Sequence, residues 1–590
     1  MVGPMRTAVA TFLLLPTLAW AQAASTPPRP NVVLVMTDDQ GFGDFGFAGN
    51  PVIRTPNLDA LARRSARLTN FYVSPVCTPT RAALMTGRWC QRTRAFDTYI
   101  GRAMMEPDEV TVAEVLRDAG YATGIFGKWH LGDCYPMRAM DQGFELALVL
   151  RGGGIGQPSD PIGGEGKYTD PVLFRNGVRE ETKGYCTDVY FREALAWMKQ
   201  CREAGRPFFC YLPTNAPHGP YRDVPEAAYR RYLADGLGPE RFPETAGAPV
   251  REKVDADRLA RTYAMIENVD DNVGRLVEAL RAMACLDDTL ILFLTDNGPE
   301  GRRWVAGYRG AKGGVHEGGI RSPLWAHWPR RLKAGDASDR VAAHVDVMPT
   351  ILAACGVAMP EGLRVDGRNV LPLLERTAEA WSDRALVIQA NRGNAPLRYH
   401  HFALRTQRWK LLNASGFGRE LEQPPKVRAE LYDMAADPYE LRDVAAQHAD
   451  VVAELLGRYD AWFDDVAATR PDTFAPPRIF VGTAAEVVTV LTRQDWRRVP
   501  QEPGWGGQGE WLVDVRRAGS YAVTVRVSGR RRAKAGTFRC GEVVCGFALE
   551  DGADEVTFAV ELKVGEGAVR VVLEDDAGEY GAHQVELRRE

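Results

Sequence analysis

The sequence predicts an α/β protein with a mostly parallel sheet covered by helices on both faces, followed by two smaller C-terminal parts. From about residue 30, apolar strand-like runs alternate with helix-period stretches, an order typical of a parallel sheet. Shorter strands and a closing helix follow over about 366–470, which predicts a small α+β subdomain. After RPDTFAPP, short alternating strands with Gly-containing turns predict a β-sandwich of roughly 110 residues.

The individual elements follow from length, periodicity and residue type. NVVLVM (31–36) has the length and β-branching of a buried strand. PFFCYLP (207–213) and TLILFLT (289–295) predict two more strands, and LARTYAMIENVDDNVGRLVEALRAM predicts the long helix between them. The stretch VTVAEVLRDAGYATGIFGKW predicts a helix, a glycine stop and a strand. In the second part, RALVIQA and HFALRTQRWKLL predict strands, and DVVAELLGRYDAWFDDV predicts the closing helix.

A chain of 590 residues is too long for one core, so several domains are expected. The predicted divisions are a leader over 1–23, a large α/β domain over 29–365, the subdomain over 366–470 and the sandwich over 476–590. A net charge of −4 argues against a general nucleic-acid surface, so no nucleic-acid partner is expected.

The N-terminus predicts export. Arg6 precedes the apolar run TAVATFLLLPTLAW, and AQA (21–23) fits a signal-peptidase site. The run is short and broken by Pro16, which favours a cleaved signal peptide over a membrane anchor, and no later stretch is long enough to span a membrane. We therefore expect a secreted or periplasmic protein. Export permits disulfides, and CGEVVC (540–545) has the spacing to close a small hairpin.

Polar residues gather where four predicted strands end. In open α/β sheets, ligands bind beyond the carboxyl ends of the strands. A single such motif would favour an ordinary turn, but four with the same kind of side chain favour a site. The oxygen donors, which suit Ca²⁺ or Mg²⁺ rather than zinc, are Asp38, Asp39, Asp296 and Asn297. The donors and cations that suit an anion beside that metal are Arg81, Lys128, His130, His218 and Lys312.

Cys77 lies in SPVCTPTRAALMTGR (74–88), just before a predicted helix. Thr78 and Pro79 fit the N-cap and first helical position, and Gly87 fits the stop. Free amides at the helix start and Arg81 in its first turn favour negative charge there. A thiolate nucleophile with a histidine base is one interpretation. However, a soft thiolate matches a hard, oxygen-ligated cation poorly.

These motifs resemble a known family. CTPTR (77–81) matches the C-x-P-x-R signature of type I, formylglycine-dependent sulfatases, which belong to the alkaline-phosphatase-like superfamily, and the match extends through AALMTGR. Further family-like blocks, in the family's order, are NVVLVMTDDQGFGD, GYATGIFGKWHLG, APHGPY, TDNGPEG, YRGAKGGVHEGGIRSP and LYDMAADPYELRDVA. The resemblance covers about 30–465, and the C-terminal sandwich lies outside it.

The resemblance implies a modified cysteine and a calcium site. In this family a formylglycine-generating enzyme converts the signature cysteine to formylglycine (3-oxoalanine), and the hydrated aldehyde offers a hard oxygen ligand. The implied Ca²⁺ ligands are Asp38, Asp39, Asp296, Asn297 and residue 77. Arg81 and Lys128 are implied to hold the diol, while His218 and Lys312 bind the sulfate with help from Lys128.

The implied reaction has two stages. One hydroxyl of the diol attacks sulfur in line and the alcohol leaves, while the cations neutralise charge on the sulfate oxygens. His130 then takes the proton of the second hydroxyl, and breakage of the C–O bond releases sulfate and regenerates the aldehyde. A serine in place of the diol would need water to cleave its sulfate ester.

Three features leave alternatives open. His316 stands where many relatives carry an aromatic residue, and either contacts substrate or packs. The glycine-rich insert at 149–168 either forms part of the substrate rim or is an ordinary surface loop. The sandwich either binds glycans or caps the larger domain, so that Trp496, Trp505 and Trp511 either stack on sugars or belong to its core.

The leading functional prediction is an exported sulfuric ester hydrolase that acts on a sulfated carbohydrate or an aryl sulfate. One alternative is a phosphodiester or phosphonate monoester hydrolase of the same superfamily, since sulfate and phosphate esters differ mainly in charge. The other is a catalytically silent glycan-binding relative, against which the complete set of expected site residues argues.

Overall fold

The structure is a computed structural model that describes residues 1–3, 29–161, 166–249, 254–418, 423–424, 426–472, 474–498, 505–527 and 531–590. The apolar run and cleavage site of the predicted signal peptide lie outside these residues. Within the described ranges, no helix combines the length and apolarity needed to cross a bilayer.

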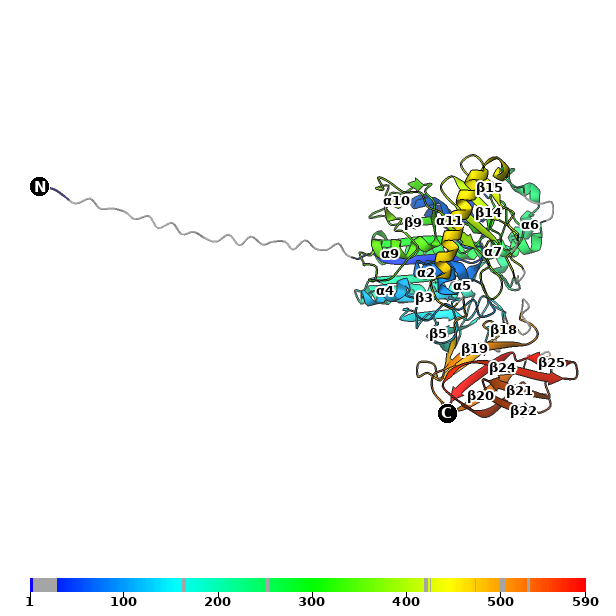
Figure 1. Cartoon of the computed structure of the whole chain (residues 1–590). Helices are drawn as coiled ribbons and strands as arrows, with labels where there is room; N and C mark the ends of the chain where they lie inside the picture. Colours follow the sequence, from blue (N-terminus) through cyan, green and yellow to red (C-terminus); the bar gives the residue numbers. More distant parts are fainter. Residues whose placement is uncertain are drawn as a thin grey trace.

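A large sheet forms the centre of the molecule (Figure 1), with strand order β10-β2-β9-β8-β1-β7-β3-β4-β5-β6 and β11 beside β2. Its strands are β1 (Asn31–Thr37), β2 (Ala66–Tyr72), β3 (Ala122–Lys128), β4 (Leu146–Leu150), β5 (Val172–Arg175), β6 (Val178–Glu181), β7 (Phe208–Pro213), β8 (Thr289–Thr295), β9 (Arg321–His327), β10 (Ala337–Ser338) and β11 (Ala342–Ala343). The central strands β8, β1, β7, β3 and β4 are parallel, whereas β9, β5 and β6 pair antiparallel toward the edges. The predicted mostly parallel sheet is confirmed.

Helices cover both faces of this sheet, as predicted. In β1, Val33 and Val35 join one buried core cluster, whereas Val32 and Leu34 join the other, because successive side chains of a strand point to opposite faces. Helices α1, α5, α6 and α7 contribute to the first cluster, and α2, α4, α9 and α10 to the second. The helices of this part are α1 (Pro56–Arg64), α2 (Cys77–Thr86), α3 (Cys90–Thr93), α4 (Val112–Asp118), α5 (Cys186–Glu203), α6 (Glu226–Asp235), α7 (Ala256–Ala282), α8 (Glu317–Ile320), α9 (Val347–Ala354) and α10 (Leu371–Leu374).

The second part is an antiparallel sheet covered by one long helix, which confirms the predicted α+β arrangement. Its elements are β12 (Leu386–Gln389), β13 (Phe402–Arg405), β14 (Trp409–Asn413), β15 (Glu430–Asp433) and α11 (Ala449–Ala467). Leu455, Tyr459 and Phe463 of α11 pack with Phe402 and Leu411 of the sheet. Their spacing of four residues puts one apolar face of the helix onto the sheet.

The third part, Ile479–Arg589, is called the β module below and lies beneath the rest of the molecule in Figure 1. One sheet has the order β16-β19-β24-β21-β22, with β18 and β25 at its side, and the other has the order β17-β26-β20-β23. The strands are β16 (Ile479–Val481), β17 (Val488–Thr492), β18 (Arg497–Arg498), β19 (Gly509–Val515), β20 (Gly519–Arg526), β21 (Ala535–Cys540), β22 (Val543–Ala548), β23 (Glu555–Leu562), β24 (Gly565–Asp575), β25 (Gly578–Gly581) and β26 (Gln584–Arg589). Trp496 and Trp511 are fully buried in the core between the sheets, so they are not available to stack on sugars.

The hairpin suggested by CGEVVC forms, but without a disulfide. Strands β21 and β22 pair so that Cys540 lies opposite Val543 and Cys545 lies opposite Phe538. Because the two cysteines are not cross-strand partners, the register does not bring their sulfurs together. All ten cysteines are free thiols.

The β module packs directly on the large α/β part. Met104, Cys134 and Met137 of the large part belong to the module's own core cluster. Arg138 Nη1 and Glu486 Oε1 form an ion pair of 3.3 Å across the contact. This contact fixes the module beside the edge of the central sheet that carries the candidate site.

A pair of buried carboxyl groups in this contact predicts a pH-dependent stability. Burial and the charge of Asp133 hold the pKa of Asp495 well above its usual range. Ionisation of Asp495 therefore lowers the free energy of unfolding. This destabilisation is zero below a pH of about 4, where the carboxyl is protonated in both the folded and the unfolded chain, and it grows as the pH rises. Asp495→Asn is expected to stabilise the protein at pH 7.5 by about 1 kcal/mol and to have no effect near pH 4, measured by thermal unfolding. Asp554→Asn, at an exposed site, is the control; a variant Asp495→Asn that melts earlier at pH 7.5 would contradict the interpretation.

Candidate active site

The predicted site residues converge because their strands are neighbours. Strands β1, β7, β3 and β8 are parallel, so their carboxyl ends meet at one edge of the sheet. The residues that follow these ends are Asp38 and Asp39 after β1, Lys128 at the end of β3 with His130 beyond it, His218 after β7, and Asp296 and Asn297 after β8. Asp39 and His130 have φ values of 61° and 59°. This left-handed backbone turns the chain sharply at the strand ends, where function commonly maintains such strain.

Helix α2 delivers Cys77 and Arg81 to the same edge. Helix α2 begins at Cys77, with Val76 as its N-cap, so the predicted N-cap role of Thr78 is wrong. The hydroxyl of Thr78 instead donates a hydrogen bond to the backbone carbonyl of His130, at 3.2 Å. Gly87 ends the helix with a φ of 67°, as predicted. Cys77 thus lies in the first helical turn, where backbone amides lack helical partners.

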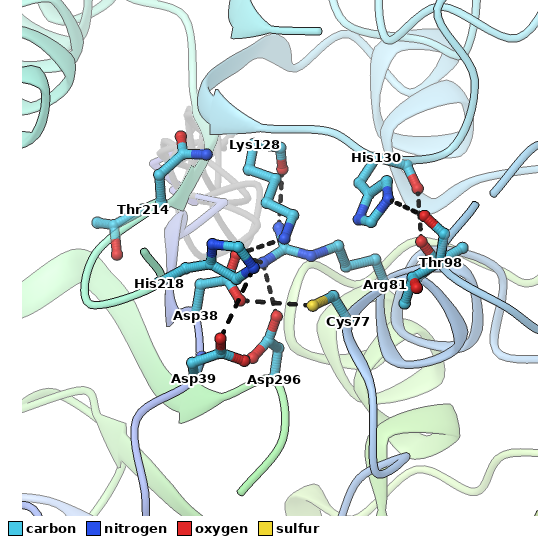
Figure 2. A network of polar contacts seen from close by, with 12 residues as sticks. Asp38, Asp39, Cys77, Arg81, Thr98, Lys128, His130, Thr214, His218 and Asp296 are labelled. Carbon is cyan, nitrogen blue, oxygen red and sulfur yellow. Dashed lines mark hydrogen bonds and ion pairs between the residues drawn. The ribbon is translucent and has the colours of Figure 1, made fainter. Parts of the chain in front are cut away.

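Asp38 lies at the centre of the cluster (Figure 2). The Cys77 thiol donates to Asp38 Oδ1 at 3.5 Å, and Lys128 Nζ lies 2.5 Å from Asp38 Oδ2. Arg81 Nη2 lies 3.5 Å from the same Asp38 oxygen and 2.8 Å from Asp296 Oδ2. Arg81 therefore ties the end of β1 to the end of β8, with all of these side chains fully buried or nearly so.

Asp39 forms the second half of the cluster. Lys312 Nζ lies 2.7 Å from Asp39 Oδ1, and His218 Nε2 lies 3.7 Å from Asp39 Oδ2. Asn297 donates from Nδ2 to Asp39 Oδ1 at 2.8 Å, and the Asp39 backbone amide donates to Asp296 Oδ1 at 3.1 Å. Cations from three separate segments, Arg81, Lys128 and Lys312, thus surround the two aspartates that follow β1.

The donor set fits a hard divalent cation. Oxygen atoms of Asp38 and Asp39 and the sulfur of Cys77 lie within 4.8 Å of one another, and Asn297 Oδ1 is buried without a hydrogen-bond partner. Burial and the charge of Asp38 raise the pKa of Asp296 to about 7, against the effect of Arg81. Nearby cations hold the pKa values of Asp38 and Asp39 below their usual range, so both carboxylates are ionised. Carboxylate and amide oxygens of this kind suit Ca²⁺.

Cys77 as an unmodified thiol is poorly suited to nucleophilic attack here. Burial and the charge of Asp38 raise the pKa of the Cys77 thiol to about 12, so it stays protonated at neutral pH. The nucleophile in cysteine chemistry is the thiolate. The geometry therefore disfavours the thiolate interpretation, in spite of the position at a helix N-terminus.

His130 is arranged to accept a proton. Its Nε2 lies 2.9 Å from the Thr98 carbonyl oxygen, which can only accept, so Nε2 carries the proton. The other ring nitrogen, Nδ1, is buried with no hydrogen-bond partner. Burial, helped by the charges of Lys128 and Arg81, holds the pKa of His130 well below its usual range, so the ring is neutral. A neutral ring with a free Nδ1 lone pair has the state that a general base requires.

A pocket of about 420 Å³ opens onto the cluster and is called the catalytic pocket below. Its lining residues are Val76, Cys77, Thr98, Tyr99, His130, Gly153, Gln157, His218, Lys312, Gly313, Arg392, Phe417 and Trp505. Cys77, His130, His218 and Lys312 were predicted as site residues. Tyr99, Arg392 and Phe417 were not, because no local sequence signal distinguishes them from ordinary loop residues. Of the three tryptophans named in the β module, Trp505 alone lines this pocket.

The glycine-rich insert forms part of the pocket wall, which decides between the two alternatives for it. A Cβ at Gly153 would lie 2.7 Å from the His130 ring, and one at Gly154 would lie 2.9 Å from the His218 ring. Both distances are shorter than van der Waals contact. The insert can therefore approach the two histidines only because these positions lack side chains.

Gly153→Ala is expected to lower kcat/KM for the reaction at this site by about 10- to 100-fold, because the new methyl group displaces the His130 ring from its position. Steady-state kinetics with thermal unfolding on the same samples measure this effect. Gly457→Ala, at a helix position in α11 with no atom within 4 Å of the added Cβ, is the matched control. Unchanged kcat/KM in Gly153→Ala would show that the insert does not position His130.

His316 is the one predicted site residue that the structure brings neither to the catalytic pocket nor to the cluster around Asp38 and Asp39. Its Nε2 lies 3.7 Å from Glu430 Oε2 of β15, and it lines a separate pocket with Arg309 and Tyr308. The chain turns at the start of α8, directly after His316, and directs it toward the antiparallel sheet. The structure therefore supports packing rather than substrate contact for this residue.

The fold and the cluster define a class of protein: an enzyme with a mostly parallel, helix-covered sheet and a buried polar site at the carboxyl ends of its strands, as in the alkaline-phosphatase-like superfamily. The sulfatase family model matches residues 30–357, more than half of the chain, and a model described as "N-sulphoglucosamine sulphohydrolase, C-terminal" matches residues 311–461. The chain belongs to the sulfatase family and is a sulfuric ester hydrolase.

Individual relatives agree with this assignment. The chain is 34% identical to arylsulfatase A of Homo sapiens over 389 residues, which are 62% of this chain and 71% of that protein. It is 30% identical to N-acetylgalactosamine-6-sulfatase of Homo sapiens over 381 residues, 60% of this chain and 67% of that protein. Among solved structures, Ps i-CgsB in complex with k-i-k-neocarrahexaose is similar, with a TM-score of 0.62, 27% identity and coverage of 74% of this chain and 93% of that one.

Proposed function

We propose that this sulfatase is an exported enzyme that releases sulfate from a sulfated carbohydrate or an aryl sulfate, using Ca²⁺ and a formylglycine at residue 77. The observation that carries the proposal is the position of Cys77, which lies in the first turn of α2, lines the catalytic pocket and is 3.5 Å from Asp38. An oxygen in place of sulfur there would be a suitable ligand for the hard cation that the surrounding donors fit.

The residues that would hold Ca²⁺ are Asp38, Asp39, Asp296 and Asn297, together with residue 77. Bound there, Ca²⁺ would act as a Lewis acid that stabilises negative charge on the reacting oxygens, and the hydrated aldehyde would supply a nucleophilic oxygen. The chain's own side chains account for the remaining requirements, which are anion binding and proton transfer.

Lys312 and His218 would bind the sulfate group. Both line the catalytic pocket next to Cys77 and remain partly accessible, with side-chain exposures of 21% and 14%. Lys128 lies deeper, against Asp38, and adds a third positive charge. Together these groups would neutralise charge that develops on the sulfate oxygens in the transition state.

His130 would act as the general base. Its free Nδ1 would accept a proton from the residue 77 diol, while Nε2 remains fixed on the Thr98 carbonyl. Arg81 would hold the position of residue 77 indirectly, since it ties Asp38 to Asp296 and donates from Nη1 to the Lys128 carbonyl at 2.8 Å.

The carbohydrate part of the proposal rests on the relatives. N-acetylgalactosamine-6-sulfatase is named for a sulfated sugar, and Ps i-CgsB was solved with a neocarrahexaose. The aryl alternative rests on the similarity to arylsulfatase A. The proposal of export, into the periplasm or the medium, rests on the signal-like N-terminus. It would be supported if Edman sequencing of the secreted protein gives an N-terminus directly after residue 23.

A screen of defined sulfated saccharides and 4-nitrophenyl sulfate, with sulfate release as the readout, tests the proposed function. The enzyme is co-expressed with a formylglycine-generating enzyme, and Cys77→Ala serves as the inactive control. The expected result is sulfate release by the wild type alone. Faster turnover of phosphate monoesters or diesters than of every sulfate ester would favour the phosphate-ester alternative instead.

A further inference from the structure

We propose that the β module is part of the substrate site: Trp505 and Tyr99 form an aromatic wall of the catalytic pocket that binds a sugar ring next to the sulfated one. The inference rests on the proposed function and names the class of substrate that the enzyme prefers. The preferred substrate class is then a sulfated oligosaccharide rather than a monosaccharide or an aryl sulfate.

The aromatic wall of Trp505 and Tyr99 lies beside two further side chains, Phe417 and Arg392, and the four come from three separate parts of the chain. Tyr99 comes from the large α/β part, Phe417 and Arg392 from the second part and Trp505 from the β module. All four line the catalytic pocket, which Cys77 also lines. The rings of Tyr99 and Trp505 meet edge to face, with centroids 5.6 Å apart and an interplanar angle of 64°. Each of the four side chains is only half buried, so part of its surface faces the pocket.

The wall is rigid. The Arg392 guanidinium lies over both Tyr99 and Phe417, 4.5 Å and 4.2 Å from the ring centroids, and its Nη1 lies 2.7 Å from Asp97 Oδ1. Cation–π contacts of this kind are attractive and stabilise the packing of the guanidinium on the rings. Because Asp97 compensates the charge of Arg392, the wall is suited to the apolar face of a sugar ring more than to a second sulfate group.

The β module positions Trp505 through a set of backbone contacts. Arg493 donates from Nη1 to the Trp505 carbonyl at 3.1 Å and from Nη2 to the Gly581 carbonyl at 2.6 Å. Gln494 donates from Nε2 to the Thr98 carbonyl at 2.7 Å, the same carbonyl that fixes His130. The module therefore holds both the aromatic wall and the segment on which the proposed base depends.

The ring of Trp505, rather than its indole N–H, is available to a sugar. Trp505 lines the catalytic pocket and is half buried, whereas its Nε1 atom is buried, as is Nε1 of Trp496 in the module's core. The ring face would pack on the carbon atoms of the sugar.

The experiment compares kcat/KM of wild type and Trp505→Ala on two kinds of probe: 4-nitrophenyl sulfate, and tetrasaccharide fractions of carrageenan, chondroitin sulfate and heparin. On the tetrasaccharide that wild type hydrolyses best, Trp505→Ala is expected to lose about 10- to 100-fold, mainly through KM. The loss on 4-nitrophenyl sulfate is expected to be at least about fivefold smaller, since that probe has no second sugar ring to pack on the wall. Trp505→Phe, which keeps an aromatic face, is expected to recover most of the tetrasaccharide activity.

Phe547→Ala is the matched control, because Phe547 is a half-buried aromatic residue of the same module that does not line the pocket. Thermal unfolding excludes misfolded variants. Equal losses on both probes, or no loss on the tetrasaccharide, would overturn the inference. The inference would also be overturned if the wild type hydrolyses 4-nitrophenyl sulfate but no saccharide, although the sulfatase assignment would then still hold. If the wild type releases no sulfate from any probe, the proposed function itself is refuted.

Discussion

Cys77→Ala is expected to abolish sulfate release, with a fall in kcat of at least about 10⁴-fold, while the protein keeps its fold. Residue 77 supplies the proposed nucleophile, and no other described side chain of the catalytic pocket occupies its place beside Asp38. The thiol makes a single hydrogen bond of 3.5 Å, so its removal has little effect on the packing of α2. Sulfate release by ion chromatography and thermal unfolding measure the two properties separately.

Cys77→Ser is the matched variant, since it keeps an oxygen at the same position but has one hydroxyl instead of two. Attack on sulfur remains possible, but the resulting serine sulfate has no second hydroxyl with which to expel sulfate from carbon. We expect at most one turnover per enzyme and a covalent sulfate on residue 77 in the intact-protein mass. Normal turnover in either variant would contradict the proposed chemistry.

Asp38→Asn is expected to lower kcat by about 10³-fold or more and to abolish Ca²⁺ binding measured by isothermal titration calorimetry. Asp38 contacts Cys77, Lys128 and Arg81, so it is the carboxylate with the most connections in the cluster. Its replacement removes an anionic oxygen from the cation site and leaves two buried positive charges with less compensation.

The matched control is Asp346→Asn. Asp346 is also a fully buried carboxylate paired with an arginine, Arg384, but it does not line the catalytic pocket. We expect it to lose stability by an amount similar to Asp38→Asn, about 3 kcal/mol, and to keep Ca²⁺ binding. If Asp38→Asn retains Ca²⁺ binding, Asp38 is not a ligand. If both variants lose Ca²⁺ binding, the loss is explained by general destabilisation rather than by a specific role of Asp38.

The core of the site could be predicted from sequence because its residues follow directly from strand ends. The fully buried strands β1 and β8 have clear apolar patterns, and Asp38 and Asp296 come immediately after them. Once the strands are parallel neighbours, these carboxylates must lie close together, whatever the details of the loops. Cys77 and Arg81 were found because a short signature defines the start of α2.

The rim of the pocket could not be predicted in this way. Tyr99 and Arg392 lie nearly 300 residues apart, and their contact depends on how three parts of the chain pack together. Trp505 has the same residue type as Trp496 and Trp511, which are buried in the core, and only the tertiary structure separates the two roles. The sequence left both substrate contact and packing open for His316, because a position next to a motif does not fix the direction of a side chain.

The most direct test of the central claim is the mass of the tryptic peptide of residues 68–81, which contains residue 77, from enzyme co-expressed with a formylglycine-generating enzyme. We predict the mass of the aldehyde or its hydrate at position 77, in a fraction that rises in proportion to the specific activity of the preparation. An active preparation whose peptide carries only an unmodified cysteine would contradict the account.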